Sequence, residues 1–213
     1  MSVPVIVIGA GGHGRVVADA LRAAGRELLG FTDADSTRQG TRLDGLLVLG
    51  GDEVLATHNV ENVVLANGVG SIGVPTRRRA VHEALAADGW RFTTVLHPRA
   101  TVSPHALLEE GAQVMAGAVV QPGAVIGVGS IVNTGALVDH DCVLGAHCHV
   151  APGATLSGQV HLGAECHVGT GAVIVQGVRL GARTLVGAGA VVVSDYPGEV
   201  TLMGVPARAK GSA

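Results

Sequence analysis

A histidine with an acidic residue on each side is the strongest candidate for chemistry in this chain. His140 stands in the run Asp139-His140-Asp141. A neutral imidazole can take up a proton near neutral pH, and an adjacent carboxylate orients the ring and stabilises its cationic form. The run therefore predicts a general base at His140 with Asp141 as its partner. From the spacing alone, a solvated polar loop stays open as the alternative.

A glycine-rich turn near the N-terminus is the second candidate. The apolar run 3–8 leads into Gly9-Ala10-Gly11-Gly12-His13-Gly14, and an amphipathic pattern covers residues 15–24. A strand, a glycine turn and a helix in this order present backbone N–H groups at a helix N-terminus, where phosphate binds. Asp33 ends the next apolar run, about 20 residues further on, where such folds carry an acid. The pattern predicts a phosphate-bearing ligand, against the alternative of a tight turn without one.

The elements around this turn alternate between strand and helix. Apolar runs predict strands at residues 3–8, 27–32, 45–49, 61–66 and 91–95, and helical patterns cover residues 15–24 and 76–87. Such alternation is typical of a small parallel sheet with crossover helices. The segment has room for one mononucleotide-binding half and not for a second, so we expect no dinucleotide.

A six-residue repeat fills most of the second half. Sixteen positions spaced six apart, from Val102 to Val192, are all Val, Leu or Ile, and a small residue follows each of them up to Val186 by four places. One branched aliphatic and one small residue per repeat suit a narrow prism with flat faces and tight corners. Glycine in the third or fourth place of many repeats permits the positive φ of a tight corner. The repeat predicts a β-helix.

The repeat also indicates where other side chains lie. His140 would stand on the outer surface, whereas Cys142, Cys148 and Cys166 fall in the small inward column and are expected to be buried and unreactive. His149 and His167 would stack if three repeats form one turn. A histidine cluster can hold a metal, which would suit a metal-dependent hydratase. This hydratase, or a scaffold without catalytic activity, is a hypothesis of a different class from the general-base enzyme. The histidine spacing fits a metal site poorly, and we expect no metal.

The two patterns meet near residue 97, where Pro98 and Pro104 bracket the change. We therefore expect two domains, residues 1–96 and 97–213.

The net charge of -3 argues against nucleic acid and anionic membranes as partners. No apolar run reaches the roughly 20 residues of a membrane helix. With no signal-peptide pattern and three cysteines lacking a CxxC spacing, we expect a reduced, cytoplasmic protein.

Several motifs together resemble one enzyme family. The motifs, in order along the chain, are Gly9–Gly14, Phe31-Thr32-Asp33, Ala66–Ser71, His97-Pro98, Asn133-Thr134-Gly135, His140-Asp141-Cys142 and Gly204-Val205-Pro206-Ala207. They resemble the sugar O-/N-acetyltransferases of the NeuD/PglD type, which include the acetyltransferases of UDP-4-amino-sugars and of GDP-perosamine. The six-residue repeat resembles that of the left-handed β-helix acyltransferases. The resemblance covers nearly the whole chain. It implies a small Rossmann-like domain, then a left-handed parallel β-helix of three repeats per turn, in a homotrimer with active sites at subunit interfaces.

The resemblance also implies a role for individual residues. His140 matches the general base and Asp141 the acid that polarises it. The acetyl-CoA positions are His149 at the thioester, Gly158 with its N–H toward the acetyl carbonyl, and Thr170 and Ala188 along the pantetheine. The substrate positions are Gly11, Gly12, His13 and Gly14 for phosphate and sugar, Asp33 for base or ribose, and Asn133 for the sugar.

The implied activity is N-acetylation of the 4-amino group of a nucleotide-linked 4-amino-4-deoxy sugar by acetyl-CoA, through direct transfer without an acyl-enzyme. Where some UDP-sugar members carry two consecutive acids, this chain has Asp33-Ala34-Asp35, which leaves UDP or GDP open. The alternative activity is O-acetylation of sialic acid or a related free sugar.

Overall fold

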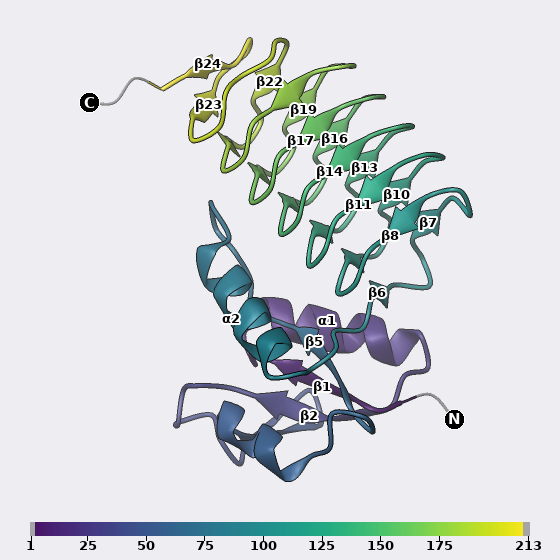
Figure 1. Ribbon diagram of the computed structural model, residues 1–213, viewed down its shortest axis with the longest axis vertical. Coiled ribbons are helices and arrows are strands. Elements are labelled where there is room, and N and C mark those ends of the chain that lie inside the picture. The colour runs from purple at the N-terminus through teal and green to yellow at the C-terminus, as the bar shows by residue number, and fades with distance from the viewer. Residues whose placement is uncertain (1–2, 211–213) are drawn as a thin grey trace.

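The structure, a computed structural model, describes residues 3–210. A sheet with helices makes up the N-terminal part, and a three-sided column of short strands makes up the rest (Figure 1). The first elements are β1 (Val5–Ile8), α1 (Gly12–Ala23), β2 (Leu28–Thr32), β3 (Arg42–Leu43), β4 (Leu46–Gly50), the 3-10 helix η1 (Asp52–Thr57), β5 (Val64–Asn67) and α2 (Thr76–Ala87).

The N-terminal sheet has the strand order β3-β4-β2-β1-β5, with every pair parallel except the β3–β4 hairpin. Successive side chains of a strand point to opposite faces. Val5 and Val7 accordingly pack with the buried side of α1, whereas Ile6 and Ile8 pack with Leu55 of η1. Both faces of β1 are therefore covered, as a parallel sheet requires. The predicted alternation of strand and helix is confirmed.

The predicted strand at residues 91–95 is wrong as a strand of this sheet. Phe92 forms only an isolated bridge to Leu65, and the chain then enters β6 (Val95–Leu96), which pairs with a strand of the column. The run 91–95 is therefore divided between the two parts of the molecule. Phe92 contacts the N-terminal sheet, and Val95 already belongs to the first strand of the column. The domain division at residue 96 stays a prediction.

The column is built from three parallel sheets of two-residue strands. The β7–β22 sheet contains β7 (Thr101–Val102), β10 (Val119–Val120), β13 (Leu137–Val138), β16 (Thr155–Leu156), β19 (Val173–Ile174) and β22 (Val191–Val192). The β8–β20 sheet contains β8 (Leu107–Leu108), β11 (Val125–Ile126), β14 (Val143–Leu144), β17 (His161–Leu162) and β20 (Arg179–Leu180). The β6–β24 sheet contains β6, β9 (Gln113–Val114), β12 (Ile131–Val132), β15 (His149–Val150), β18 (His167–Val168), β21 (Leu185–Val186), β23 (Thr201–Met203) and the antiparallel β24 (Arg208–Ala209).

Each strand from β6 to β19 pairs with the strand three places further along the chain, so one turn contains three repeats. Val120 lies opposite Val138, for example, and both are buried. The small inward column is buried too, including all three cysteines. The predicted fold class, a small α/β domain followed by a parallel β-helix, is confirmed.

Two edges of the column matter for function. The Thr134 corner, between the β6–β24 and β7–β22 sheets, consists of residues 115–117, 133–135, 151–153, 169–171 and 187–189. The His140 corner, between the β7–β22 and β8–β20 sheets, consists of residues 121–123, 139–141, 157–159 and 175–177. Most turns use a glycine with positive φ, such as Gly135 at 66°, but Asp141 takes this conformation at 57°. Aspartate tolerates the left-handed region better than most residues do.

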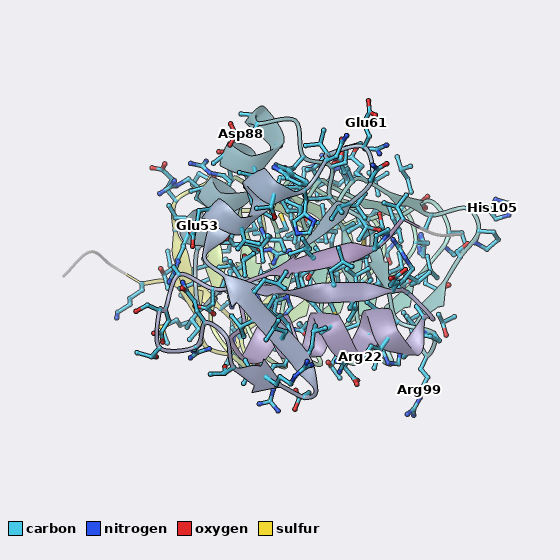
Figure 2. The ribbon with its side chains drawn as sticks, turned by 90° about the horizontal axis from the view of Figure 1, so that it is seen from below. Arg22, Glu53, Glu61, Asp88, Arg99 and His105 are labelled. Atoms are coloured by element: carbon cyan, nitrogen blue, oxygen red, sulfur yellow. The ribbon has the colours of Figure 1, made fainter. Side chains whose placement is uncertain are left out.

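The N-terminal domain covers the β6–β24 sheet. The side chains that point outward from this sheet at Gln113, Ile131 and His149 are all buried. Viewed from the N-terminal domain, acidic and basic side chains, including Arg22, Glu61 and Asp88, lie around the periphery (Figure 2). No helix within residues 3–210 is long and apolar enough to cross a membrane.

Candidate active site

A cavity of about 840 Å³ lies between the N-terminal domain and the Thr134 corner. The N-terminal domain supplies the first residues of α1 and the loop 68–72, and the β-helix supplies Asn133, Thr134, His149 and Pro152. The cavity therefore brings together predicted substrate and acetyl-CoA residues from segments far apart in the sequence. Those that line it are Gly11, Gly12, His13, Asp33, Asn133 and His149.

The N-terminus of α1 opens into this cavity. Gly11 is the N-cap, and neither a capping side chain nor an acidic residue occupies the first turn. The first N–H groups of a helix have no partner within it, and they carry a partial positive charge. A Cβ at Gly11 or Gly12 would meet nothing within 4 Å, so a ligand can approach this backbone closely. The arrangement suits a phosphate group.

Gly14, the fourth predicted contact of this turn, does not line the cavity. It is buried, and a Cβ here would collide with the carbonyl oxygen of Gly9. Glycine at this position therefore allows α1 to pack closely on the end of β1. The role of Gly14 is packing and not ligand contact.

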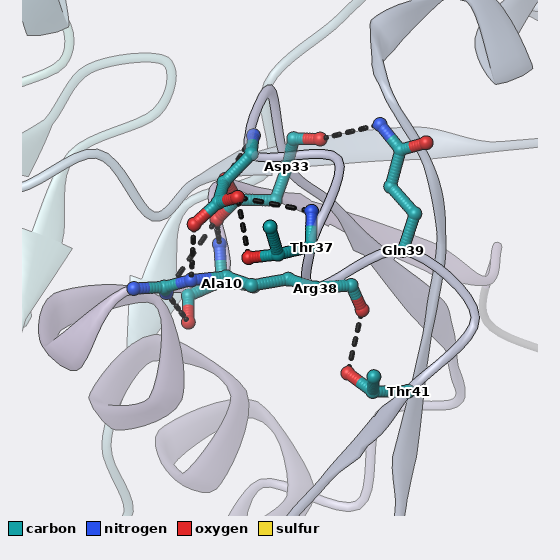
Figure 3. Close-up of polar contacts among 7 residues, drawn as sticks. Ala10, Asp33, Thr37, Arg38, Gln39 and Thr41 are labelled. Carbon is teal, nitrogen blue, oxygen red and sulfur yellow. Dashed lines mark hydrogen bonds and ion pairs between the residues drawn. The ribbon is translucent and has the colours of Figure 1, made fainter.

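Asp33 lines the cavity but uses its carboxylate to shape the turn (Figure 3). Its oxygens accept hydrogen bonds from the N–H groups of Ala10 at 2.8 Å and Asp35 at 2.9 Å. Arg38 donates to the Ala10 carbonyl at 2.9 Å. Asp33, which was predicted to contact the base or the ribose, thus holds the glycine-rich turn 9–14 (the phosphate turn) against the loop 33–38. This loop forms one wall of the cavity.

His13 contributes a neutral imidazole to the cavity wall. Its Nε2 lies 2.9 Å from Oε1 of Gln113, and Nε2 of Gln113 donates to the Asn67 carbonyl at 2.7 Å. Because the amide oxygen only accepts, His13 must carry its proton on Nε2. Burial, aided by the nearby charge of Arg78, lowers the pKa of His13 to about 4.

Arg78 is a cation buried beneath the cavity, which sequence reasoning missed. It donates to the carbonyl oxygens of Asn67 and Val69 at 2.8 Å and to that of Gly129 at 3.3 Å. It is 1% exposed, and burial lowers its pKa to about 9. Arg78 thus connects the loop 68–72 (the cavity loop) to the β-helix. The run Arg77-Arg78-Arg79 offered no sign of which arginine would be buried.

His149 is held from both sides. Its Nδ1 lies 2.8 Å from Oγ of Ser71 in the cavity loop, and its Nε2 lies 3.0 Å from Nδ2 of Asn133. Its ring also packs edge-on against that of His167, with centroids 4.9 Å apart, so the predicted stacking is present. Burial, with the neighbouring His167, His13 and Arg78, lowers the pKa of His149 to about 3. Ser71 had no assigned role in the sequence, because its contact joins residues 78 apart.

His140 and Asp141 meet at the other edge of the column. His140 is exposed, and its Nδ1 lies 2.9 Å from Oδ2 of Asp141. The hydrogen bond to Asp141 and the charges of Asp139 and Asp141 raise the pKa of His140. Gly158 lies in the next turn, where a Cβ would collide with the ring near its Nε2. The predicted base, its acid and the predicted oxyanion glycine are therefore adjacent.

Thr170 and Ala188 lie at the Thr134 corner, both exposed. They follow Thr134 and Pro152 at intervals of one turn, and the Thr170 carbonyl accepts a hydrogen bond from Gly189 at 2.9 Å. The predicted pantetheine positions thus lie on the same edge of the column as Thr134 and Pro152, but they do not line the cavity. His140 is on a different edge, with the β7–β22 sheet between them. Within residues 3–210, no three His, Cys, Asp or Glu side chains group closely enough to hold a metal.

Comparisons with known proteins give this site a family. Residues 4–85 match the PglD N-terminal domain. The acetyltransferase domain of PglB from Neisseria gonorrhoeae, solved with acetyl coenzyme A, superposes with a TM-score of 0.92 at 42% identity, covering 99% of this chain and 100% of that one. The chain belongs to the PglD-type sugar acetyltransferases.

Other members of the PglD-type family have the same architecture. PerB from Caulobacter crescentus, solved with CoA and GDP-perosamine, shares 40% identity and a TM-score of 0.90, covering 98% of this chain and 97% of that one. WeeI from Acinetobacter baumannii shares 25% identity and a TM-score of 0.80, covering 98% and 100%. A comparison with curated proteins found no match. The expected enzyme class, an acetyl-CoA-dependent sugar acetyltransferase, is confirmed by family membership.

Proposed function

We propose that this enzyme transfers the acetyl group of acetyl-CoA to the 4-amino group of a nucleotide-linked 4-amino-4-deoxy sugar. The cavity carries this proposal, because it joins an uncapped helix N-terminus to the Thr134 corner. The exposed Arg77 on its lining adds a cation suited to a diphosphate. PerB, whose structure contains GDP-perosamine, supports a nucleotide-linked acceptor over a free sugar. UDP- and GDP-linked sugars are both candidates.

His140 is the proposed general base. Since the Asp141 carboxylate only accepts hydrogen bonds, Nδ1 of His140 carries its proton, and Nε2 presents a lone pair. The amine nitrogen attacks the thioester carbonyl and gives a proton to Nε2. The C–S bond then breaks, and the proton passes to the departing CoA sulfur. The Gly158 N–H, which has no hydrogen-bond acceptor among residues 3–210, is suited to the developing oxyanion.

Direct transfer needs no protein nucleophile. The thiol nearest the proposed base is Cys142, which is buried inside the column and donates to the Ser157 carbonyl at 3.1 Å. Burial raises the pKa of this thiol to about 11, so it is protonated at neutral pH. The attacking group is therefore the substrate amine, held in place by the cavity.

The positions of His140 and the cavity favour a site shared by two chains. They lie at different edges of the column, with the β7–β22 sheet between them. The outer face of that sheet carries apolar side chains that the chain itself leaves partly or fully exposed, at Val119, Leu137, Val173 and Val191. Such a face indicates an interface. We propose a homotrimer in which the His140 corner of one chain meets the cavity of the next.

The test replaces the base and compares acceptors. His140→Ala should lower turnover by about 10²- to 10⁴-fold, because general-base catalysis contributes that much. Acetyl-CoA affinity, measured by calorimetry, should stay within a few-fold of wild type. Wild-type turnover on UDP- or GDP-linked 4-amino sugars should exceed turnover on the free amino sugar or on sialic acid. Near-normal turnover of His140→Ala contradicts the base assignment, and preference for a free sugar contradicts the acceptor.

A further inference from the structure

A chain of three hydrogen bonds crosses from the β-helix to the cavity loop. The Thr134 N–H donates to Oδ1 of Asn133 at 2.8 Å. Nδ2 of Asn133 lies 3.0 Å from Nε2 of His149, and Nδ1 of His149 lies 2.8 Å from Oγ of Ser71. Asn133, His149 and Ser71 all line the cavity. The chain therefore ends on a hydroxyl in the proposed substrate site.

The first link sets the direction of the whole chain. A backbone N–H can only donate, so the Asn133 atom that faces Thr134 is the carbonyl oxygen. The NH₂ group of the same amide then points at Nε2 of His149. Since an NH₂ group can only donate, Nε2 of His149 must be an unprotonated acceptor.

The last link, from His149 to Ser71, follows from the charge state of His149. The side chain is buried, with His13, His167 and the cation Arg78 nearby, so the ring is neutral. A neutral imidazole carries a single proton, and because Nε2 accepts from Asn133 this proton is on Nδ1. That proton is donated to Oγ of Ser71. Oγ of Ser71 is thus an acceptor toward His149, and its own hydrogen is directed elsewhere.

We propose that Ser71 donates a hydrogen bond to an oxygen atom of the sugar–phosphate part of the acceptor, in a direction imposed through His149 and Asn133. Ser71 has no other side-chain hydrogen bond to residues 3–210. Gly70 lies beside His13, since a Cβ on Gly70 would sit 3.2 Å from the Cβ of His13. Ser71, the residue after Gly70, therefore lies near the N-terminus of α1. In the proposed function this helix end binds the phosphate, so the sugar attached to the phosphate lies close to Ser71. The inference rests on the proposed nucleotide-sugar function.

Ser71 is a binding residue in this account, and His149 and Asn133 are positioning residues. The direction matters because oxygen atoms of a phosphate can accept a hydrogen bond but cannot donate one. A Ser71 hydroxyl turned the other way would present a lone pair to the same ligand atom and repel it. The chain thus selects a hydrogen-bond acceptor at this point of the ligand.

The first experiment measures the contribution of Ser71 to acceptor binding. Ser71→Ala should raise the Kd of the nucleotide-linked amino sugar by about 3- to 10-fold, as expected for one hydrogen bond. Ser71→Thr, which keeps the hydroxyl, should recover part of this loss. Ser103→Ala, which changes a serine on the first turn of the column, should not alter acceptor binding. An unchanged acceptor Kd in Ser71→Ala overturns the inference.

The second experiment reads the proton position on His149 directly. Nitrogen-15 NMR of histidine-labelled wild-type protein should show Nδ1 protonated and Nε2 unprotonated at pH 7. Asn133→Asp, whose carboxylate can only accept, should place a proton on Nε2. A wild-type spectrum with the proton on Nε2, or an Asn133→Asp spectrum without one there, overturns the chain.

The two measurements separate this inference from the proposed function. If wild-type protein turns over no nucleotide-linked amino sugar, the proposed function fails, yet the NMR spectra still decide the direction of the chain. If wild-type turnover is normal and Ser71→Ala binds the acceptor as tightly as wild type, the function stands and the role of Ser71 is wrong.

Discussion

His140 and Asp141 each lie against a glycine of a neighbouring turn, where a larger residue would leave no room for them. A Cβ on Gly158 would collide with the imidazole, and one on Gly123 would collide with the Asp141 carboxylate. The pair thus lies between glycines of the preceding and following turns. This could not be predicted from the local run, because the glycines come from other turns. It follows from the repeat once three hexads are known to form one turn.

Asp141→Asn should move the pH dependence of turnover. The hydrogen bond to Asp141 is the largest influence that raises the pKa of His140. As a base, His140 works only when unprotonated, so wild-type turnover is lost as pH falls through that raised pKa. Removing the carboxylate lowers this pKa, and the acid limb should shift to lower pH while maximal turnover falls. A pH–rate profile checks this, and an unshifted or upward-shifted acid limb contradicts it.

Gly158→Ala should displace the base without disturbing the fold. The φ angle of Gly158 is not in the positive range, so the substitution brings a collision with His140 and little backbone strain. A displaced catalytic group can cost about 10²-fold in turnover. We expect a kcat loss of this order with an unchanged acceptor KM. Gly12→Ala, which fills the phosphate turn, should instead raise the acceptor KM. Equal kinetic defects in the two variants would refute this division of roles.

Among the elements, the turns of the column are joined by a polar ladder inside an otherwise apolar core. Ser130, Cys148 and Cys166 occupy one inward column, and each donates to a corner carbonyl: Gly145 at 2.9 Å, Gly163 at 3.1 Å and Gly181 at 3.2 Å. The repeat correctly predicted that these side chains are small and buried. It could not show that they satisfy backbone carbonyls, because size alone explains the pattern.

Cys148→Ser and Cys148→Ala should therefore differ in stability. Serine keeps a donor to the Gly163 carbonyl and already fills the equivalent position at Ser130. Alanine leaves that carbonyl without its partner, which costs about 1–3 kcal/mol. Urea unfolding should show Cys148→Ala losing about that much and Cys148→Ser losing less. If serine destabilises as much as alanine does, the thiol contributes by packing alone.

For the whole molecule, sequence patterns predicted each half better than the contact between them. The hexad period set the register of the β-helix, including the approach of His149 to His167. The contacts across the cavity, such as Ser71 with His149 and Arg78 with Gly129, join residues 78 and 51 apart. No local periodicity encodes such pairs, and the side chains that make them resemble ordinary loop or helix-surface residues. The placement of His140 and the cavity on different edges also required the structure.

The assembly of one site from two chains is the central claim, and mixed trimers test it most directly. His140→Ala removes the base, and Gly12→Phe fills the phosphate turn, so each variant alone should have little turnover. Coexpressed with different tags and purified as mixed trimers, the two should recover activity. A cyclic trimer of both variants has one intact pairing among its three interfaces, or about one third of wild-type turnover. Mixed trimers no more active than their parents would show that the base and the cavity do not meet between chains.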